Sequence, residues 1–165
     1  MAEKSPMTVK GHQRLQEEVR RLKTVDRIQA SKAIEIARAH GDLSENAEYD
    51  AAKNAQGLLE ARIRDLESKL SMAQVVDISA LSGSKVVFGA TVQIIDLTTD
   101  ESRRISIVGE EESAVEHGLI SFKSPLARAL IGKQAGDIAQ VRLPAGEKEY
   151  EIVDVQFIEI ALIEK

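Results

Sequence analysis

Two long stretches in the first half of the chain repeat apolar residues at intervals of three and four positions. In residues 10–39 the repeating positions are Leu15, Val19, Leu22, Val25 or Asp26, Ile28, Ala33, Ile36 and Ala37. In residues 47–76 they are Ala52, Ala55, Leu59, Ile63, Leu66, Leu70 and Ala73. This spacing predicts two amphipathic helices, each with one buried stripe. Because only a short turn separates them, we expect residues 1–78 to form an antiparallel two-helix coiled coil.

The hydrophobic pattern changes after residues 79–84, a serine-rich stretch that we interpret as a linker. Beyond it, apolar residues follow the shorter period of β-strands. The expected strands are residues 86–88, 90–95, 102–108, 119–122, 137–143 and 149–157. The last two strands pair as a hairpin across residues 144–146. A bulge near Ile152 and Val153 would reconcile two alternation phases in the last strand.

A short helix is predicted between these strands, at residues 124–132. Ser124 suits the N-cap, Pro125 suits the first helical position, and Gly132 suits the position just past the end. Residues 85–165 are therefore expected to form a compact domain of antiparallel strands with one short helix. The predicted fold class of the chain is α+β.

The composition is that of a folded, water-soluble protein, with 43% hydrophobic and 30% charged residues. No apolar stretch reaches the roughly 18–20 residues of a membrane-spanning helix, and residues 1–7 lack the apolar core of a secretory signal. We therefore expect a cytoplasmic chain that makes no membrane contact. The absence of cysteine excludes a disulfide framework, a thiolate zinc site and a cysteine nucleophile.

Charge and aromatic content narrow the choice of partners. Acidic and basic residues balance over residues 1–78, so the formal net charge of −5 arises in the remainder of the chain. A general grip on nucleic-acid phosphates needs a basic face, which the C-terminal domain lacks. Only 3% of residues are aromatic, which argues against a base-stacking surface.

The turn between the two helical stretches, residues 41–46, is short and acidic. One interpretation is structural: Asp42 and Glu45 fit a capping box at the start of the second helix, with Ser44 and Asn46 as alternative caps. The other is chemical, because two carboxylates three positions apart can serve as ligands of a hard cation such as Mg²⁺. Two carboxylates alone make a weak site, so a partner would have to supply the other ligands.

Three motifs of the chain resemble those of a known family. Residues 37–49 read ARAHGDLSENAEY, followed by AAK at 51–53 and by Arg62, Ile63, Leu66 and Glu67. Residues 88–92 read FGATV, and residues 124–133 read SPLARALIGK. In this order, the motifs resemble those of the bacterial Gre transcript cleavage factors, which act in transcription elongation, and in particular their GreA type. The resemblance spans nearly the whole chain.

The resemblance implies both a partner and a mechanism. In this family the C-terminal domain, which has an FKBP-like fold, docks on the rim of the secondary channel of RNA polymerase, while the coiled coil enters the channel. The tip carboxylates, matching Asp42 and Glu45, then help to hold the second Mg²⁺ of the polymerase active site. The polymerase itself cleaves the backtracked RNA. The chain would thus be an accessory factor rather than an enzyme, acting as a monomer and binding Mg²⁺ poorly when free.

The resemblance also assigns roles to residues outside the turn. From the residues alone, Arg38 and Lys53 are interpreted as solvated helix charges. The resemblance favours another role, because they match positions that in the family face the RNA 3′ end. Ser124, Pro125 and Leu126 match a region involved in polymerase docking. Asp50 departs from the family pattern, which commonly has histidine here, and its added negative charge is expected to hinder RNA approach.

Two other functions remain open at this level. A paralogue of the same fold would enter the channel and inhibit the polymerase without promoting cleavage, although both tip carboxylates are retained. A prolyl isomerase or chaperone would follow from the FKBP-like domain alone. Its four aromatic residues, Phe88, Phe122, Tyr150 and Phe157, make an aromatic proline pocket improbable.

Overall fold

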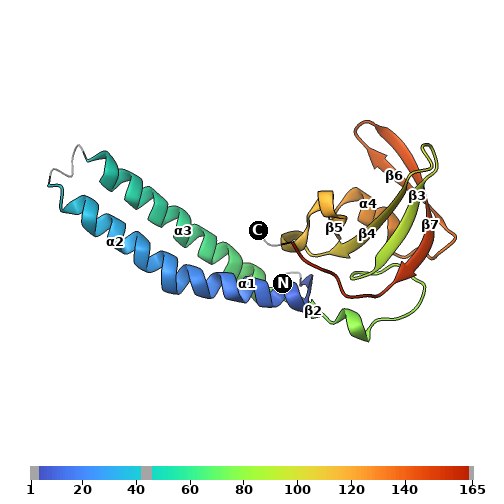
Figure 1. Ribbon diagram of the computed structural model, residues 1–165, viewed down its shortest axis with the longest axis horizontal. Coiled ribbons are helices and arrows are strands. Elements are labelled where there is room, and N and C mark those ends of the chain that lie inside the picture. The colour runs from blue at the N-terminus through green and yellow to red at the C-terminus, as the bar shows by residue number, and fades with distance from the viewer. Residues whose placement is uncertain (1–3, 42–45, 164–165) are drawn as a thin grey trace. The chain divides into compact units, whose positions relative to one another are not determined.

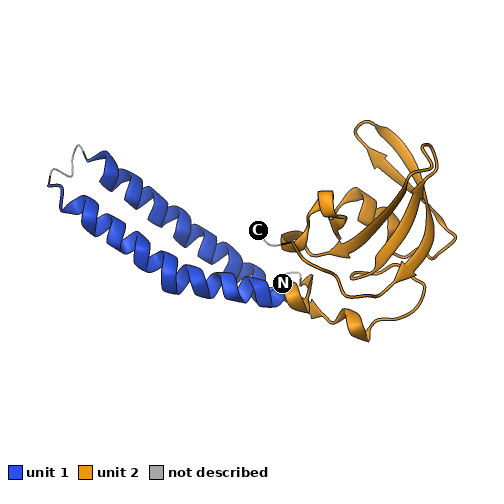
Figure 2. Ribbon diagram, in the orientation of Figure 1, with its two compact units in different colours: residues 1–3, 12–73 blue, residues 4–11, 74–165 orange. Residues whose placement is uncertain are grey.

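The computed structural model describes residues 4–41 and 46–163 of the chain. These residues divide into two compact units, coloured separately in Figure 2. One unit contains residues 12–73, and the other contains residues 4–11 together with 74–163. The units therefore do not follow the expected boundary at residue 78, because residues 4–11 and 74–78 belong to the C-terminal unit. None of the helices in these described residues is long and apolar enough to span a membrane.

The first unit is a helical hairpin, as the periodicity predicts (Figure 1). One arm consists of α1 (Val9–Arg21), whose first three residues belong to the other unit, a five-residue π-helix (Leu22–Asp26) and α2 (Arg27–Arg38). The other arm is α3 (Ala47–Ser71). The expected seam residues that are buried are Leu15, Val19, Leu22, Ala37, Ile63 and Leu66.

The π-helix changes which face of the first arm is buried. Its wider turn is closed by a hydrogen bond from the Arg27 N–H to the Leu22 carbonyl, and the Thr24 hydroxyl bonds back to the Arg20 carbonyl at 2.7 Å. A π-turn holds one residue more than an α-turn, so it shifts the phase of the residues that follow. The seam then runs through Asp26, Ala30, Ile34 and Ala37.

Three predicted seam positions in this arm are consequently wrong, because Ile28 and Ile36 are 54% and 64% exposed and Ala33 is also exposed. Of the two alternatives at the preceding turn, Asp26 is half-buried in the seam and Val25 is 46% exposed. In the second arm Ala55 is exposed, because the seam passes through the partly buried Gln56 at that turn. The remaining predicted positions of α3 are buried or half-buried.

Ion pairs between the arms accompany the apolar seam. The Arg27 guanidinium binds both carboxylate oxygens of Glu60 at 2.8 Å, and this hydrogen bonding lowers the pKa of the Glu60 carboxyl. Lys23 pairs with Glu67 at 3.0 Å. These side chains are partly exposed to solvent, so each ion pair contributes little to stability.

Two short strands lie next to the hairpin helices in the sequence, and the second of them occupies residues that were predicted to be helical. β1 (Ser5–Thr8) pairs with β2 (Ala73–Val76) in a two-stranded sheet. The second helix therefore ends at Ser71, with Met72 as its C-cap, and not at the predicted residue 76. Pairing with β1 satisfies backbone groups that a helix extending through residues 73–76 would have bonded internally.

The C-terminal unit is built on a five-stranded sheet with the order β5-β4-β3-β7-β6 (Figure 1). Its strands are β3 (Thr91–Asp96), β4 (Ser102–Val108), β5 (Leu119–Ser121), β6 (Ile138–Leu143) and β7 (Gly146–Gln156). The predicted antiparallel sheet is a mixed one, because β5 runs parallel to β4. This pairing is possible because residues 109–118 cross over between the two strands and bring the chain back in the same direction.

Other predictions for this unit are confirmed. The register between β3 and β7 shifts at Gln93 and Ile94, which leaves Val153 as the extra residue of a bulge in β7. β6 and β7 form the expected hairpin, with Leu143 opposite Gly146. Residues 86–88, in contrast, form no strand; they lead into a turn at Gly89, which has a φ of +90°.

The main core lies between this sheet and α4 (Pro125–Leu130). Its fully buried side chains include Val92, Ile94, Ile107, Leu130 and Ile152. A second, smaller cluster contains Val108, Ala114, Leu119 and Ile160, with Ile78, Leu162 and Ile163 against it. Residues 158–163 thus close one side of the C-terminal unit.

Candidate functional site at the end of the helical hairpin

The end of the hairpin is held together by Asn46. Its side-chain oxygen accepts a hydrogen bond from the Tyr49 N–H at 3.1 Å, which makes Asn46 the N-cap of α3. Its amide nitrogen donates to the Ala37 carbonyl at 2.6 Å, near the end of α2. One asparagine therefore both starts the second arm and ties it to the first.

Asp42 and Glu45, the candidate metal ligands, lie outside the described residues. The capping box that would place Asp42 at the N-cap of the second helix is nevertheless wrong, because α3 begins at Ala47 and Asn46 occupies that position. The alternative cap, Asn46, is the correct one. The N-cap of α3 is therefore Asn46 and not Asp42.

Charged side chains flank the turn on both arms. Arg38 lies in the last turn of α2 and Lys53 lies two turns into α3, and both are exposed. His40 approaches Glu48 at 3.3 Å, a pair that the sequence motif did not suggest. Glu48 and Asp50 are the acidic residues of the first turn of α3, where carboxylates are favoured by the helix dipole. The roles of Arg38 and Lys53 toward RNA stay predictions.

The candidate docking residues lie at the start of α4. Ser124 is the N-cap, accepting from the Ala127 N–H at 3.2 Å, and Pro125 is exposed at the first helical position. Leu126 is half-buried and packs against the main core. The predicted helix is confirmed, while its docking role stays a prediction.

Sequence reasoning missed the aromatic neighbours of this helix. The rings of Phe88 and Phe122 pack edge to face, with their centroids 5.9 Å apart. The Lys123 ammonium lies 5.8 Å from the Phe122 ring centre and 3.1 Å from the Glu110 carboxylate. A proximity between residues 88 and 122 depends on the sheet topology, so the local pattern carries no signal for it.

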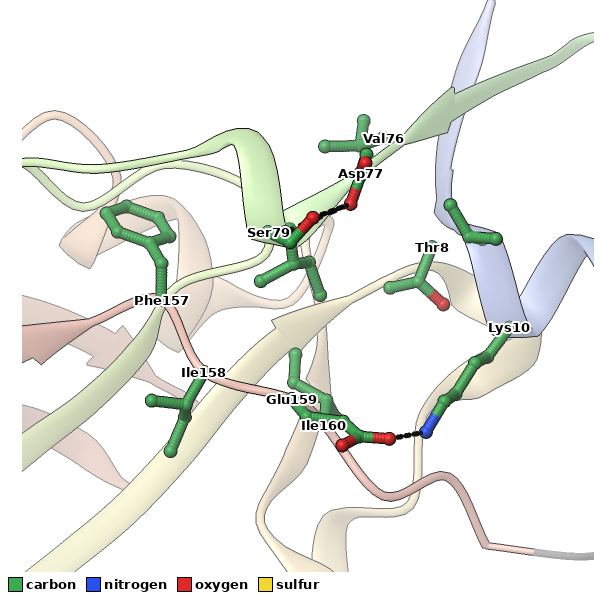
Figure 3. Close-up of a pocket in the computed structure, with 11 residues that line it drawn as sticks. Thr8, Lys10, Val76, Asp77, Ser79, Phe157, Ile158, Glu159 and Ile160 are labelled. Atoms are coloured by element: carbon green, nitrogen blue, oxygen red, sulfur yellow. Dashed lines mark hydrogen bonds and ion pairs between the residues drawn. The ribbon is translucent and has the colours of Figure 1, made fainter.

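A pocket of about 430 Å³ opens in the C-terminal unit (Figure 3). Its walls come from residues 8–10, 76–79 and 157–160, and they are mostly apolar. Lys10 and Glu159 form an ion pair at its edge, and the Asp77 carboxylate accepts from the Ser79 hydroxyl at 2.7 Å. In the part of the chain that the structure describes, no group of three or more His, Asp and Glu side chains is placed to hold a metal ion.

Comparisons with known proteins cover both units. The family model "Transcription elongation factor, N-terminal" matches residues 5–75, and "Transcription elongation factor, GreA/GreB, C-term" matches residues 81–157. Transcription elongation factor GreA of Phenylobacterium zucineum is 53% identical over 156 residues, which cover 94% of this chain and 99% of the relative. The factor of the same name from Xanthomonas axonopodis pv. citri is 54% identical over 157 residues, with the same coverage.

A solved structure is also similar. The GreA factor homolog 1 protein of Thermus thermophilus is 27% identical, with a TM-score of 0.43, and the match covers 93% of this chain and 99% of that one. The family models and the curated relatives agree with the resemblance seen in the motifs. The chain therefore belongs to the GreA/GreB family of transcription elongation factors.

Proposed function

We propose that this elongation factor enters the secondary channel of bacterial RNA polymerase and stimulates the polymerase's own cleavage of backtracked RNA, which releases arrested complexes. The observation that carries the proposal is the helical hairpin, whose two arms are joined by the segment containing Asp42 and Glu45. Membership of the GreA/GreB family and the tip motif of residues 37–49 support it.

Asp42 and Glu45 are the oxygen ligands that the factor contributes to the Mg²⁺ site. Carboxylates suit Mg²⁺, which is commonly held by one or two of them together with waters and phosphate oxygens. When bound, the second Mg²⁺ supplies Lewis-acid assistance to phosphodiester hydrolysis. Because the remaining ligands belong to the polymerase and the RNA, the free factor binds Mg²⁺ weakly. The factor is thus an accessory protein, and the hydrolytic centre is the polymerase's.

The cap arrangement supports this division of roles. Asn46 takes the N-cap position of α3, so the cap position itself is not assigned to Asp42. Arg38 and Lys53, exposed on the flanking turns, place positive charge where it can neutralise phosphates near the RNA 3′ end.

The C-terminal unit serves to dock the factor. We assign it an FKBP-like fold and place its contact with the channel rim at Ser124, Pro125 and Leu126. The exposed Pro125 and the half-buried Leu126 offer a small apolar surface beside Lys123. Docking through this unit leaves the hairpin free to reach into the channel.

The test is a cleavage assay on stalled elongation complexes with the double variant Asp42→Asn, Glu45→Gln. We expect loss of most stimulation, since the amides keep the side-chain shape but lose the negative charge that holds Mg²⁺. Glu35→Gln is the matched control, because it removes one carboxylate from an exposed position on α2.

The assay also separates the competing functions. Full stimulation by the double variant, with wild-type helix content, would rule out the metal-ligand role. A wild-type factor that binds the polymerase and slows it without any cleavage would identify the inhibitory paralogue instead. Catalysed isomerisation of a proline peptide by the intact chain would point to the third function.

A further inference from the structure

Glu112 is a buried carboxylate with an unusual set of partners. It is 2% exposed and lies at the end of a 3₁₀-helix (Glu110–Glu112) of the C-terminal unit. Its Oε1 atom accepts hydrogen bonds from the Thr8 N–H at 2.9 Å and from the Gly109 N–H at 3.3 Å. Its Oε2 atom accepts from the Thr8 hydroxyl. A buried carboxyl group needs such bonds, and two of the three come from a residue 104 positions away.

Thr8 is in turn the N-cap of α1. Its hydroxyl oxygen accepts a hydrogen bond from the Gly11 N–H at 3.0 Å, three positions into the helix. A hydroxyl has one proton and two lone pairs. Because the proton goes to Glu112, a lone pair is left to face the Gly11 N–H. Glu112 therefore sets the orientation that makes Thr8 an effective cap.

Glycine at position 11 is explained by the same carboxylate. A Cβ atom at residue 11 would lie 2.7 Å from the Glu112 Cγ atom and even closer to its carboxyl carbon. All three of its nearest neighbours belong to the Glu112 side chain. That side chain is fixed by three hydrogen bonds, so it does not move aside without losing some of them. Glycine otherwise disfavours a helix, by about 1 kcal/mol relative to alanine in a helix interior.

Gly109 makes room for the same group in a different way. A Cβ at this residue would lie 2.8 Å from the Glu112 Oε1 atom but also 3.0 Å from the Pro6 carbonyl oxygen. The second neighbour is backbone, which is less free to move than a side chain. Removing the Glu112 side chain therefore relieves a clash at position 11 but only half of the clash at position 109.

We propose that Glu112 is a positioning residue that fixes where the first helix of the hairpin begins. It acts through Thr8, whose hydroxyl it orients as the cap, and it requires glycine at positions 11 and 109. The C-terminal unit thereby fixes the residue at which α1 begins. The first residues of α1, Val9–Gly11, belong to that unit.

The decisive experiment is a double-mutant cycle between Gly11→Ala and Glu112→Ala in the full-length chain, read by hydrogen exchange of the α1 amides. In the Glu112 background, Gly11→Ala should speed exchange of the Thr8 and residue-11 amides at least about tenfold, because the new methyl group displaces the carboxylate. In the Glu112→Ala background, the same substitution should leave exchange unchanged or slow it, since alanine favours a helix. The reversal of sign is specific to the proposal.

Two other glycines are matched controls. Gly109→Ala should stay destabilising in both backgrounds, because of the Pro6 carbonyl. Gly57→Ala, which meets nothing within 4 Å, should stabilise α3 equally in both. The proposal is overturned if Gly11→Ala has the same effect with and without Glu112, or if Glu112→Ala leaves exchange at Thr8 and Gly11 unchanged.

A second pair of variants keeps the proposal testable if Glu112→Ala does not fold. Thr8→Ser retains the hydroxyl and should preserve slow exchange at Gly11. Thr8→Val is nearly isosteric with threonine but lacks the hydroxyl, and it should speed that exchange by about tenfold. Equal exchange in the two variants would show that the cap does not act through the hydroxyl.

Discussion

The side-chain amide of Asn46 makes two hydrogen bonds, and substitutions can remove one of them or both. Its oxygen caps α3 at Tyr49, and its nitrogen binds the Ala37 carbonyl on the other arm. A carboxylate performs only the first task, and a methyl group performs neither. This makes a short series of substitutions informative about how the end of the hairpin is held.

We expect Asn46→Ala to destabilise the hairpin by about 1–2 kcal/mol, through the loss of the cap and of the bond to Ala37. Asn46→Asp should lose less, because it keeps the acceptor and gains a favourable charge at a helix N-terminus. The measurement is hydrogen exchange at the Tyr49 amide, with urea unfolding followed by helix content. Equal exchange in Asn46→Ala and the wild-type chain would contradict the capping role.

The sequence limits the cap to a few residues but does not choose among them. Asp42, Ser44 and Asn46 all carry side chains that can cap a helix. What decides is the residue at which helical backbone begins, and that depends on the contact between Asn46 and the other arm. Local pattern therefore finds the turn between the arms, whereas tertiary contact selects the residue that closes it.

At the scale of helices and strands, the sequence predicts which elements form better than it predicts which face of a helix is buried. Both arms of the hairpin, α4 and most strands follow from periodicity and capping signals. The π-turn at Leu22–Asp26 does not, because the apolar residues Val25 and Ile28 continue the α-helical spacing convincingly. β1, β2 and β5 have three or four residues each, so their pairing depends on segments distant in the chain.

The difference in burial between two residues of α3 predicts different effects of their substitution on stability. Ile63 is 1% exposed and Leu58 is 74% exposed, although both are large apolar residues of the same helix. Ile63→Ala should cost about 2–5 kcal/mol of hairpin stability, because it leaves a cavity in the seam. Leu58→Ala should stay within about 0.5 kcal/mol of the wild-type value.

Urea unfolding monitored by hydrogen exchange of α3 amides measures both variants in the full-length chain. A large loss for Leu58→Ala would mean that the exposed face is covered in solution. A small loss for Ile63→Ala would instead contradict the observed seam. Val25, Ile28 and Ile36 are exposed like Leu58, because the π-turn shifts the buried face of the first arm away from them.

At the scale of the whole molecule, the first and the last described segments, residues 4–11 and 158–163, both belong to the C-terminal unit. Glu112 holds Thr8 in the first segment, and residues 158–163 lie against the same unit at the other end. The family model for the C-terminal domain stops at residue 157, so the tail lies beyond the matched region. The sequence motifs assign no role to this tail. Its packing partners, Val108, Ala114 and Leu119, are distant in the chain, so the local pattern does not reveal them.

The tail is nevertheless an integral part of this unit. Ile160 is 6% exposed, whereas Ile158 is 38% exposed. Burial of an isoleucine side chain contributes about 1.5–3 kcal/mol. The solvated pair of Lys10 and Glu159 contributes little by comparison, although its hydrogen bond lowers the pKa of the Glu159 carboxyl. Whatever this pair contributes is present above the ordinary pKa of glutamate and is lost as the pH falls through the lowered value.

Removal of residues 158–165 should therefore lower the stability of the C-terminal unit, and Ile160→Ala should reproduce most of that loss, at about 2 kcal/mol. Ile158→Ala is the matched control and should cost well under about 1 kcal/mol, since that side chain is already solvated. Hydrogen exchange of the β4 and β5 amides, compared with α3 amides of the same sample, localises the effect. Exchange that accelerates equally in α3, or a tailless chain as stable as the intact one, would show that the tail is not a structural part of the unit. The expected pattern, with β4 and β5 affected and α3 unchanged, would establish the tail as an added wall of the second hydrophobic cluster.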